Sequence, residues 1–343
     1  MKKNSFYDIS ILGFCGICLV VLGHSLPSRF VYDEQYLTVL NTIISVIYIF
    51  HMPLFFYISG YLTKYSSKSS LLCEFKSKAK RLLLPYLMFS IIGYIVKWPL
   101  SEFAGRPVDF SSFDFVFRLL YPWENPVIFF WFLPTLFIVS IVFYLFVFFL
   151  RYLLIKLNFE GRGYETAFFA FVFAALLLVI IFTSGFSYRS FEPEFLNLTG
   201  VAYHLPFFIL GYLIALINRA QLIYLLLVFL FVFLFFKMLF FNDIIRLEAA
   251  VYLLSFHVLA KLVSQSSMGN SQVVLYGYSN NMTIYLLSFF FQVPMGFIVY
   301  QFSNSPLQMI FWSFVIGFLG PVVFKLALNR HVFGQRLIKF VGM

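Results

Sequence analysis

Charged residues are scarce in this chain, because Asp, Glu, Lys and Arg make up only 11% of its 343 residues. The two sizeable polar segments cover residues 64–81 and 99–126, and neither is long enough to fold as a soluble domain. In ordinary soluble domains about a quarter of the residues are charged. The composition therefore excludes a water-soluble globular protein and predicts an integral membrane protein.

Cysteine is also rare, and the three residues present (Cys15, Cys18 and Cys73) provide no disulfide framework. Cys15 and Cys18 form a C-x-x-C pair, but it lies in an apolar run without a second pair to complete a metal site. We interpret both as small packing residues on a helix, and we expect no metal ion. The first apolar run is too long, and too poor in small-residue cleavage signals, for a cleaved signal peptide.

Hydrophobic residues are abundant, at 62% of the chain, and 51 of them are Phe. A membrane-spanning helix needs about 20 apolar residues, and the chain offers roughly ten such runs. They lie near residues 9–26, 41–63, 82–98, 127–150, 166–184, 200–217, 221–241, 248–264, 282–301 and 306–328. The runs at 82–98 and 248–264 are the weakest, since each contains a lysine. The sequence thus predicts an all-α, polytopic membrane protein, with a single integral-membrane domain over residues 1–343.

The basic residues predict the orientation of these spans. If the N-terminus is cytoplasmic, 17 of the 24 Lys and Arg residues fall on the cytoplasmic side and 7 on the other. This bias obeys the positive-inside rule, and an even number of spans places both termini in the cytoplasm. The net charge of +10 is then explained by topology and contact with membrane lipids, so we expect no nucleic-acid partner.

Two histidines lie within the first two apolar runs, where an imidazole is costly and therefore often functional. His24 is near the outer end of the first run, and a simpler interpretation is that it only bonds the last carbonyls of a helix. His51 lies deeper, beside Pro53, which frees a backbone carbonyl. Histidine is well suited to proton transfer near neutral pH, so we take both as candidate catalytic residues. For His204 and His257 we expect packed, hydrogen-bonded side chains.

Three more segments have both a functional and an ordinary interpretation. Lys78 and Arg81 lie in a basic segment before the third run, and can bind a phosphorylated donor or anionic lipid headgroups. Trp131 opens the fourth run and can be an interfacial aromatic residue. The preceding loop mixes charged and aromatic side chains, which suits a sugar or a solvated loop. These loop residues are Arg106, Asp109, Asp114, Arg118, Trp123 and Glu124.

Several segments, in order along nearly the whole chain, resemble the membrane-bound acyltransferase-3 family. Within it the chain is similar to fucose 4-O-acetylases and polysaccharide O-acetyltransferases. The segments are Leu19–Ser25, Phe50–Tyr61, Lys80–Tyr86, Trp131–Pro134, Leu205–Tyr212 and Ile284–Leu287. The family's expected number of spans agrees with the roughly ten apolar runs counted here.

The resemblance implies transfer of an acetyl group from cytoplasmic acetyl-CoA to a hydroxyl of a cell-surface or envelope polysaccharide. Such an acceptor is an O-antigen, an exopolysaccharide or a lipid-linked oligosaccharide, and the enzyme is a multi-pass protein of the inner membrane. His24 takes the role of the family's catalytic histidine with His51 close to it, and Lys78 and Arg81 contact the CoA phosphates. We favour His24 as general base or acyl carrier, with Tyr57 or Tyr48 as a hydroxyl donor. Trp131 is a further supporting residue, and no bound cofactor is implied.

The chain departs from the family pattern at three positions. Gly13 and Ser10 stand where the family usually has a basic residue and Asp, and Ser288 stands where it often has His. Either another base supplies the missing charge, or the protein is an inactive homologue. Two functions of a different class compete with acyl transfer: a polysaccharide transporter or flippase without covalent chemistry, and a membrane polymerase of surface glycans.

Overall fold

A computed structural model describes the protein at residues 7–25, 34–66, 71–97, 111–158, 168, 171–173, 175–176, 194–217, 219–240, 245–265, 271–303 and 305–341. The elements found in these residues are helical. The chain divides into two compact units, of which the first comprises Met1–Ile58 with Asn218–Met343 and the second comprises Ser59–Ile217. The assignment of one domain to the whole chain stays a prediction.

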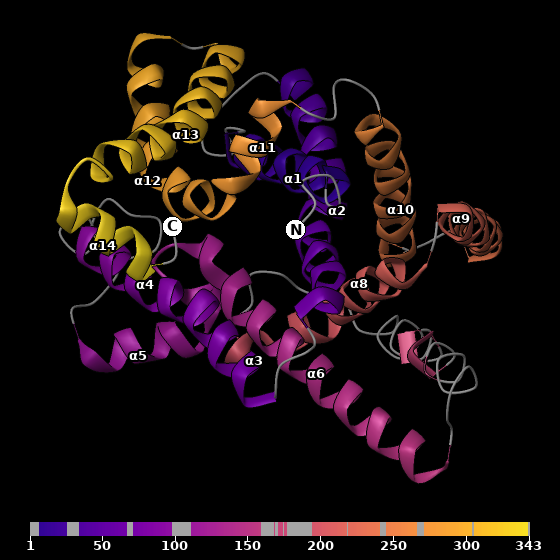
Figure 1. Cartoon of the computed structure of the whole chain (residues 1–343). Helices are drawn as coiled ribbons and strands as arrows, with labels where there is room; N and C mark the ends of the chain where they lie inside the picture. Colours follow the sequence, from indigo (N-terminus) through magenta and orange to yellow (C-terminus); the bar gives the residue numbers. More distant parts are fainter. Residues whose placement is uncertain are drawn as a thin grey trace. The chain divides into compact units, whose positions relative to one another are not determined.

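The first unit contains two N-terminal and six C-terminal helices (Figure 1). The N-terminal ones are α1 (Tyr7–Ser25) and α2 (Glu34–Ser66). The last turns of α2, after Ile58, belong to the second unit. The others are α9 (Arg219–Phe240), α10 (Ile245–Ser264), α11 (Gln272–Ser279), α12 (Asn281–Phe302), α13 (Pro306–Leu328) and α14 (Val332–Val341). Helix α1 packs against α10, α11, α12 and α13, and most of its residues are buried. It is therefore the central helix of this unit.

Hydrogen bonds within the first unit define the directions of its helices. The side chain of Asn281 donates to the carbonyl of Gly13 at 2.9 Å, and that of Gln292 donates to the carbonyl of Val21 at 2.8 Å. Helices α1 and α12 are therefore parallel. Lys325, in the last turn of α13, bonds the residue before Asn281, so it lies at the end of the unit where α1 begins. This agrees with the predicted orientation, which puts Lys325 and the N-terminus on one side of the membrane.

The second unit contains the end of α2 followed by shorter helical pieces and two long helices. The elements are α3 (Leu71–Lys78), the π-helix η1 (Ala79–Leu83), α4 (Leu84–Lys97), α5 (Ser112–Leu120), the 3₁₀ turns η3 (Pro122–Glu124) and η4 (Ile128–Trp131), α6 (Phe132–Lys156), η5 (Phe195–Asn197) and α8 (Leu198–Leu216). Helices α6 and α8 pack against each other, and η1 packs against α6. The segment that the sequence predicts as the third span thus begins earlier and contains a π-helical turn.

Eight helices in the described residues are long and apolar enough to cross a membrane. They are Tyr7–Ser25, Thr38–Tyr65, Leu72–Lys97, Ile128–Lys156, Phe195–Leu216, Leu247–Ser264, Asn281–Phe302 and Pro306–Leu328. Both of the weak predictions, 82–98 and 248–264, correspond to helices in this set. The run at 221–241 is the helix α9, with a shorter apolar part, Ala220–Phe231, while the run at 166–184 lies mostly outside the described residues.

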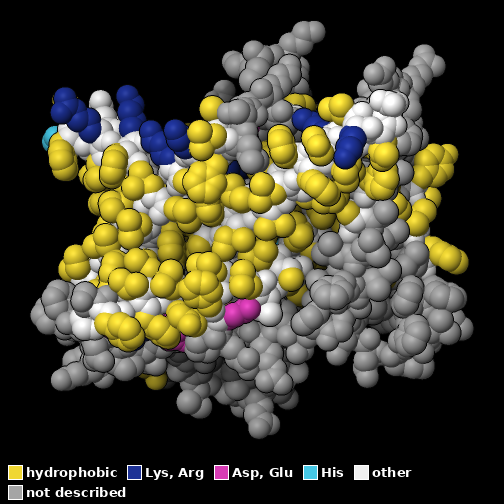
Figure 2. Space-filling model, turned by 90° about the horizontal axis from the view of Figure 1, so that it is seen from below, with side chains coloured by type: hydrophobic (Ala, Val, Ile, Leu, Met, Phe, Trp, Pro, Cys, Tyr) yellow, Lys and Arg dark blue, Asp and Glu magenta, His cyan; other side chains and the backbone are white. Residues whose placement is uncertain are grey.

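The exposed surface supports the membrane assignment. On the face shown in Figure 2, hydrophobic side chains cover most of the described area. Large apolar residues such as Phe231, Phe148 and Leu307 are more than half exposed. A water-soluble protein rarely exposes so many large apolar side chains. The protein is therefore a multi-pass membrane protein with an all-helical fold.

Candidate functional site

The two N-terminal histidines are brought together by the close approach of α1 and α2. A Cβ added to Gly23 would lie 3.4 Å from the ring of Tyr48, and one added to Gly16 would lie 3.1 Å from the ring of Phe55. Small residues let helix backbones approach closely in membranes, where packing rather than water drives association. Gly16 and Gly23 are seven residues apart, so they lie on one face of α1. His24 follows Gly23 at the last turn, as predicted from the sequence.

Tyr48 lies between the two imidazoles. Its hydroxyl is 3.4 Å from Nδ1 of His24, a long hydrogen bond, and its ring meets the His51 ring edge-on with 4.8 Å between centroids. Catalytic hydrogen bonds are often long before substrate is bound, so this distance is compatible with a working site. Of the two tyrosines proposed as hydroxyl donors, Tyr48 is the one beside His24. Together His24, Tyr48 and His51 form what we call the histidine pair site.

The hydrogen bond of His51 determines its tautomer. Nδ1 of His51 lies 2.8 Å from the carbonyl oxygen of Ile47, which can only accept, so Nδ1 carries the proton. In the neutral ring Nε2 is then unprotonated and able to accept a proton. The side chain is only 3% exposed. His51 is therefore a buried imidazole held in the form that a general base requires.

A buried amide holds the end of α1 beside His24. Nε2 of Gln292, on α12, donates to the carbonyl of Val21 and to the hydroxyl of Ser25, each at 2.8 Å. The oxygen of the same amide is buried and has no hydrogen-bond partner among the described residues. Gly317 on α13 leaves room for this side chain, because a Cβ there would overlap it. Gln292 thus fixes the helix end that carries His24 and retains an unused acceptor.

The position of the missing basic residue, Gly13, is filled by neighbouring side chains. A Cβ at Gly13 would overlap the ring of Tyr278, and the amide of Asn281 binds the Gly13 carbonyl. A long basic side chain therefore has no room there. A cation nevertheless lies in this neighbourhood, since Lys325 binds Asn280 at 2.9 Å, next to Asn281.

Tyr57 is not at the histidine pair site. Its hydroxyl bonds Nδ1 of His257 on α10, and Nε2 of that ring lies 3.2 Å from a carboxylate oxygen of Asp8, in the first turn of α1. The expectation of a packed, hydrogen-bonded His257 is confirmed. Sequence reasoning missed Asp8, because a single acidic residue at the start of an apolar run resembles an ordinary helix-end residue. Its only signal was a carboxylate at the edge of a span.

Lys78 and Arg81 lie in the second unit on either side of the start of a π-helix. Lys78 ends α3 and is partly buried, with Glu74 and Arg81 as its charged neighbours, whereas Arg81 is exposed within η1. Glu74 is itself buried and accepts a hydrogen bond from Tyr144 at 3.0 Å. Short π-helical turns are frequent at functional sites. The turn places an accessible guanidinium next to a half-buried ammonium, a pair able to bind phosphate.

Trp131 is a buried member of an aromatic stack and not an exposed interfacial residue. Its ring stacks on Trp123, at 4.8 Å between centroids, and on His204, at 5.5 Å. The indole N–H of Trp123 donates to Asn197 at 3.0 Å, and Asn197 donates to Thr135 at 2.8 Å. The stack therefore connects η3, η4 and α8, and a supporting role for Trp131 stays a prediction.

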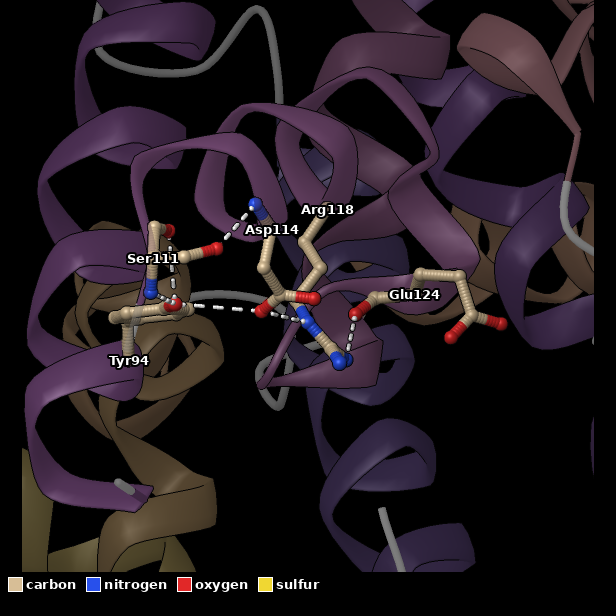
Figure 3. Close-up of polar contacts among 5 residues, drawn as sticks. All are labelled: Tyr94, Ser111, Asp114, Arg118 and Glu124. Carbon is tan, nitrogen blue, oxygen red and sulfur yellow. Dashed lines mark hydrogen bonds and ion pairs between the residues drawn. The ribbon is translucent and has the colours of Figure 1, made fainter. Parts of the chain in front are cut away.

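The polar loop residues that the structure describes bind one another (Figure 3). Arg118 donates from Nε to Asp114 at 2.7 Å and from Nη1 to the carbonyl of Glu124 at 3.1 Å. Tyr94 donates to Asp114 at 3.3 Å, and the Ser111 hydroxyl accepts from the backbone N–H of Asp114 at 3.0 Å, which caps α5. These contacts fit the interpretation as an ordinary loop. The other two loop residues, Arg106 and Asp109, lie outside the described residues.

The fold and these clusters define a class of protein: a multi-pass helical membrane protein with a buried and a partly buried imidazole on either side of a phenol. Within the described residues, no group of three or more His, Cys, Asp or Glu side chains is arranged to hold a metal ion. Residues 6–330 match the family model of the acyltransferase-3 acyltransferase domain, so the chain belongs to that family. No curated protein and no solved structure is similar enough to the chain to count as a match.

Proposed function

We propose that this acyltransferase moves an acetyl group from cytoplasmic acetyl-CoA to a hydroxyl of a cell-surface or envelope polysaccharide, or of its lipid-linked precursor. The observation that carries the proposal is the histidine pair site in a chain that belongs to an acyltransferase family. Attack of a hydroxyl on a thioester needs a base for the hydroxyl proton and donors for the oxyanion. Imidazole and phenol provide both kinds of group. The inner membrane of the cell is the proposed location.

His24 is the proposed base or acyl carrier in this reaction. As a base it takes the proton of the acceptor hydroxyl while the oxygen attacks the acetyl carbonyl carbon. As a carrier it attacks the thioester itself, CoA leaves as a thiolate, and the acceptor hydroxyl then displaces the imidazole. His51, with its unprotonated Nε2, is its partner in either route. The Tyr48 hydroxyl, 3.4 Å from Nδ1 of His24, is the proposed donor to a developing oxyanion.

The acyl donor is proposed to bind through Lys78 and Arg81. Replacing both by alanine is expected to raise the KM for acetyl-CoA about 10-fold while kcat changes less than two-fold, because charge-assisted phosphate contacts hold the donor equally before and during reaction. Initial rates of CoA thiol release over a range of acetyl-CoA concentrations measure both constants. Lys76→Ala, which removes another exposed cation of α3, is the matched control. A fall in kcat at constant KM, or an equal effect of Lys76→Ala, would contradict this assignment.

The acceptor class is tested by the acetyl content of the host's surface polysaccharide. Deletion of the gene is expected to remove alkali-labile acetyl groups, and the intact gene to restore them. His24→Ala and His51→Ala are expected to restore much less. Unchanged acetylation after deletion would reject the enzyme and favour a transporter or an inactive homologue. Full restoration by both variants would reject the histidine pair site while leaving the acetyltransferase in place.

A further inference from the structure

Three buried ionisable side chains form one hydrogen-bonded chain across three helices of the first unit. Tyr57 on α2, His257 on α10 and Asp8 on α1 are 0%, 0% and 9% exposed. The Tyr57 hydroxyl bonds Nδ1 of His257, and Nε2 of His257 lies 3.2 Å from Asp8. Taking a carboxylate and an imidazole out of water is costly unless they bond each other, which is the arrangement here. None of these groups belongs to the histidine pair site.

Each hydrogen bond of this series is donated in the same direction, from Tyr57 through His257 to Asp8. An ionised Asp8 can only accept, so Nε2 of His257 carries the proton and Nδ1 accepts from Tyr57. A proton that reaches the Tyr57 oxygen lets the tyrosine pass its own proton to Nδ1, and the ring passes the Nε2 proton to Asp8. Lys261, one turn after His257 on α10, is the charged neighbour of both His257 and Asp8. The ground state is therefore prepared to receive a proton at Tyr57 and to release it at Asp8.

The hydrogen-bonded series starts at Tyr57, which lies between His51 and the predicted cytoplasmic end of α2. Tyr57 follows His51 by six residues, about 9 Å along the helix axis, in the direction of the predicted cytoplasmic end. Asp8 precedes His24 by 16 residues on α1, which is about 24 Å. Helices α1 and α10 meet at Asp8 and His257, near the start of one and the last turns of the other. The hydrogen-bonded chain thus leads away from His24, toward the end where α1 begins.

We propose that Tyr57, His257 and Asp8 are a proton relay between the histidine pair site and the cytoplasmic end of α1. The inference rests on the proposed function, in which an O–H bond breaks at the acceptor and an ester C–O bond forms. At the donor the C–S bond breaks and its electron pair stays on sulfur. The relay carries the acceptor's proton to Asp8, which releases it to water at the cytoplasmic end of α1, and the CoA thiolate takes up a proton from water to form the S–H bond. After this transfer the ring proton of His257 is on Nδ1. Its return to Nε2 restores the starting hydrogen-bond pattern.

Purified enzyme tests the relay with acetyl-CoA as donor and polysaccharide from the deletion strain as acceptor. Tyr57→Phe removes one hydroxyl and is expected to lower kcat about 10- to 100-fold, with KM for acetyl-CoA unchanged within about two-fold. The loss is smaller than the roughly 10²–10⁴-fold typical of a general acid–base group, because Tyr57 does not contact the reacting atoms. Asp8→Asn is expected to lower kcat similarly and to reduce the solvent deuterium isotope effect. Tyr86→Phe, which removes a buried tyrosine hydroxyl bonded to the Leu119 carbonyl, is the matched control and keeps its rate.

A second variant separates proton transfer from simple packing. His257→Ala opens a space for imidazole, and added imidazole is expected to raise its kcat at least about five-fold if the lost function is proton transfer. If His257 only holds the helices together, added imidazole is expected to leave kcat unchanged. The relay is overturned if Tyr57→Phe keeps kcat within two-fold of the unmodified enzyme, or if folded His257→Ala loses activity that imidazole does not restore. If the unmodified enzyme releases no CoA thiol, the proposed function itself fails.

Discussion

Replacement of His24 by glutamine is expected to lower kcat for acyl transfer by a factor of about 10²–10⁴, the range typical of a lost general acid–base group. Glutamine approximates the size of imidazole and keeps polar atoms near Tyr48, but it cannot take up a proton or carry an acetyl group. The side chain lies at the end of α1 and is only partly buried, so the fold loses little. Initial rates of CoA thiol release in detergent or proteoliposomes measure the effect.

His331→Gln is the matched control, because His331 is exposed after α13 and belongs to the same residue type. It is expected to retain full activity. His51→Gln is expected to lose activity by a similar factor to His24→Gln, and the double variant by little more than either, because groups that act as one unit are not additive. A His24→Gln protein that is folded and retains more than half of its activity would exclude His24 from the chemistry.

Base and carrier routes predict different intermediates for the same histidine. If His24 carries the acetyl group, mixing the protein with radiolabelled acetyl-CoA alone yields labelled protein and one CoA thiol per chain. The label then transfers to added polysaccharide. If His24 is only a base, no label is retained without acceptor. In both cases the Tyr48 hydroxyl lies next to Nδ1 of His24, so the site geometry suits either route.

Much of the fold was predictable from the sequence because lipid leaves few choices to a backbone. Each polar backbone group must be satisfied within its own segment, so an apolar run of sufficient length becomes a helix. The run at 282–301, for example, is the helix Asn281–Phe302, and 306–328 is the helix Pro306–Leu328. The π-helical turn at Ala79–Leu83 was not predictable, because its energetic difference from an α-helical turn depends on packing against α6.

The candidate site was predictable only in part. His24 and His51 stood out because imidazole is rare in lipid-embedded runs, and a tyrosine beside them was named. Helix rotation is set by packing between helices, so the choice of Tyr48 over Tyr57 required the structure. Contacts between residues more than 200 positions apart, such as Asp8 with His257 and Gln292 with Val21, leave no signal in one sequence.

A helix–helix contact in the second unit explains two of the segments that carry the family resemblance. Gly60, in the Phe50–Tyr61 segment, lies against the backbone of Phe208, in the Leu205–Tyr212 segment. The backbones of α2 and α8 are therefore in direct contact at Gly60 and Phe208. Lys64, one turn after Gly60, donates to the carbonyl of Ala215 and holds the same two helices together. The two segments are thus the two sides of one helix–helix contact.

Gly60→Ala is expected to destabilise the protein by about 3 kcal/mol, at the upper end of overpacking costs, and to lower its melting temperature by about 6 °C or more. The added Cβ would overlap the carbonyl oxygen of Phe208, and a backbone atom cannot move aside as a flexible side chain can. Helices α2 and α8 would have to separate, with loss of their dispersion contacts. Thermal unfolding in detergent, followed by the loss of monodisperse protein on size exclusion, measures the change.

Gly296→Ala on α12 is the matched control, because its Cβ would lie 3.6 Å from the Ser313 hydroxyl, an ordinary contact distance. Both substitutions add the same methyl group to a glycine within a membrane helix, and both gain the same helix propensity. The control is therefore expected to melt within about 2 °C of the unmodified protein or slightly above it. If Gly60→Ala were equally stable, α2 and α8 would not touch at this glycine. The contact between the two segments would then not explain why Gly60 is part of the pattern.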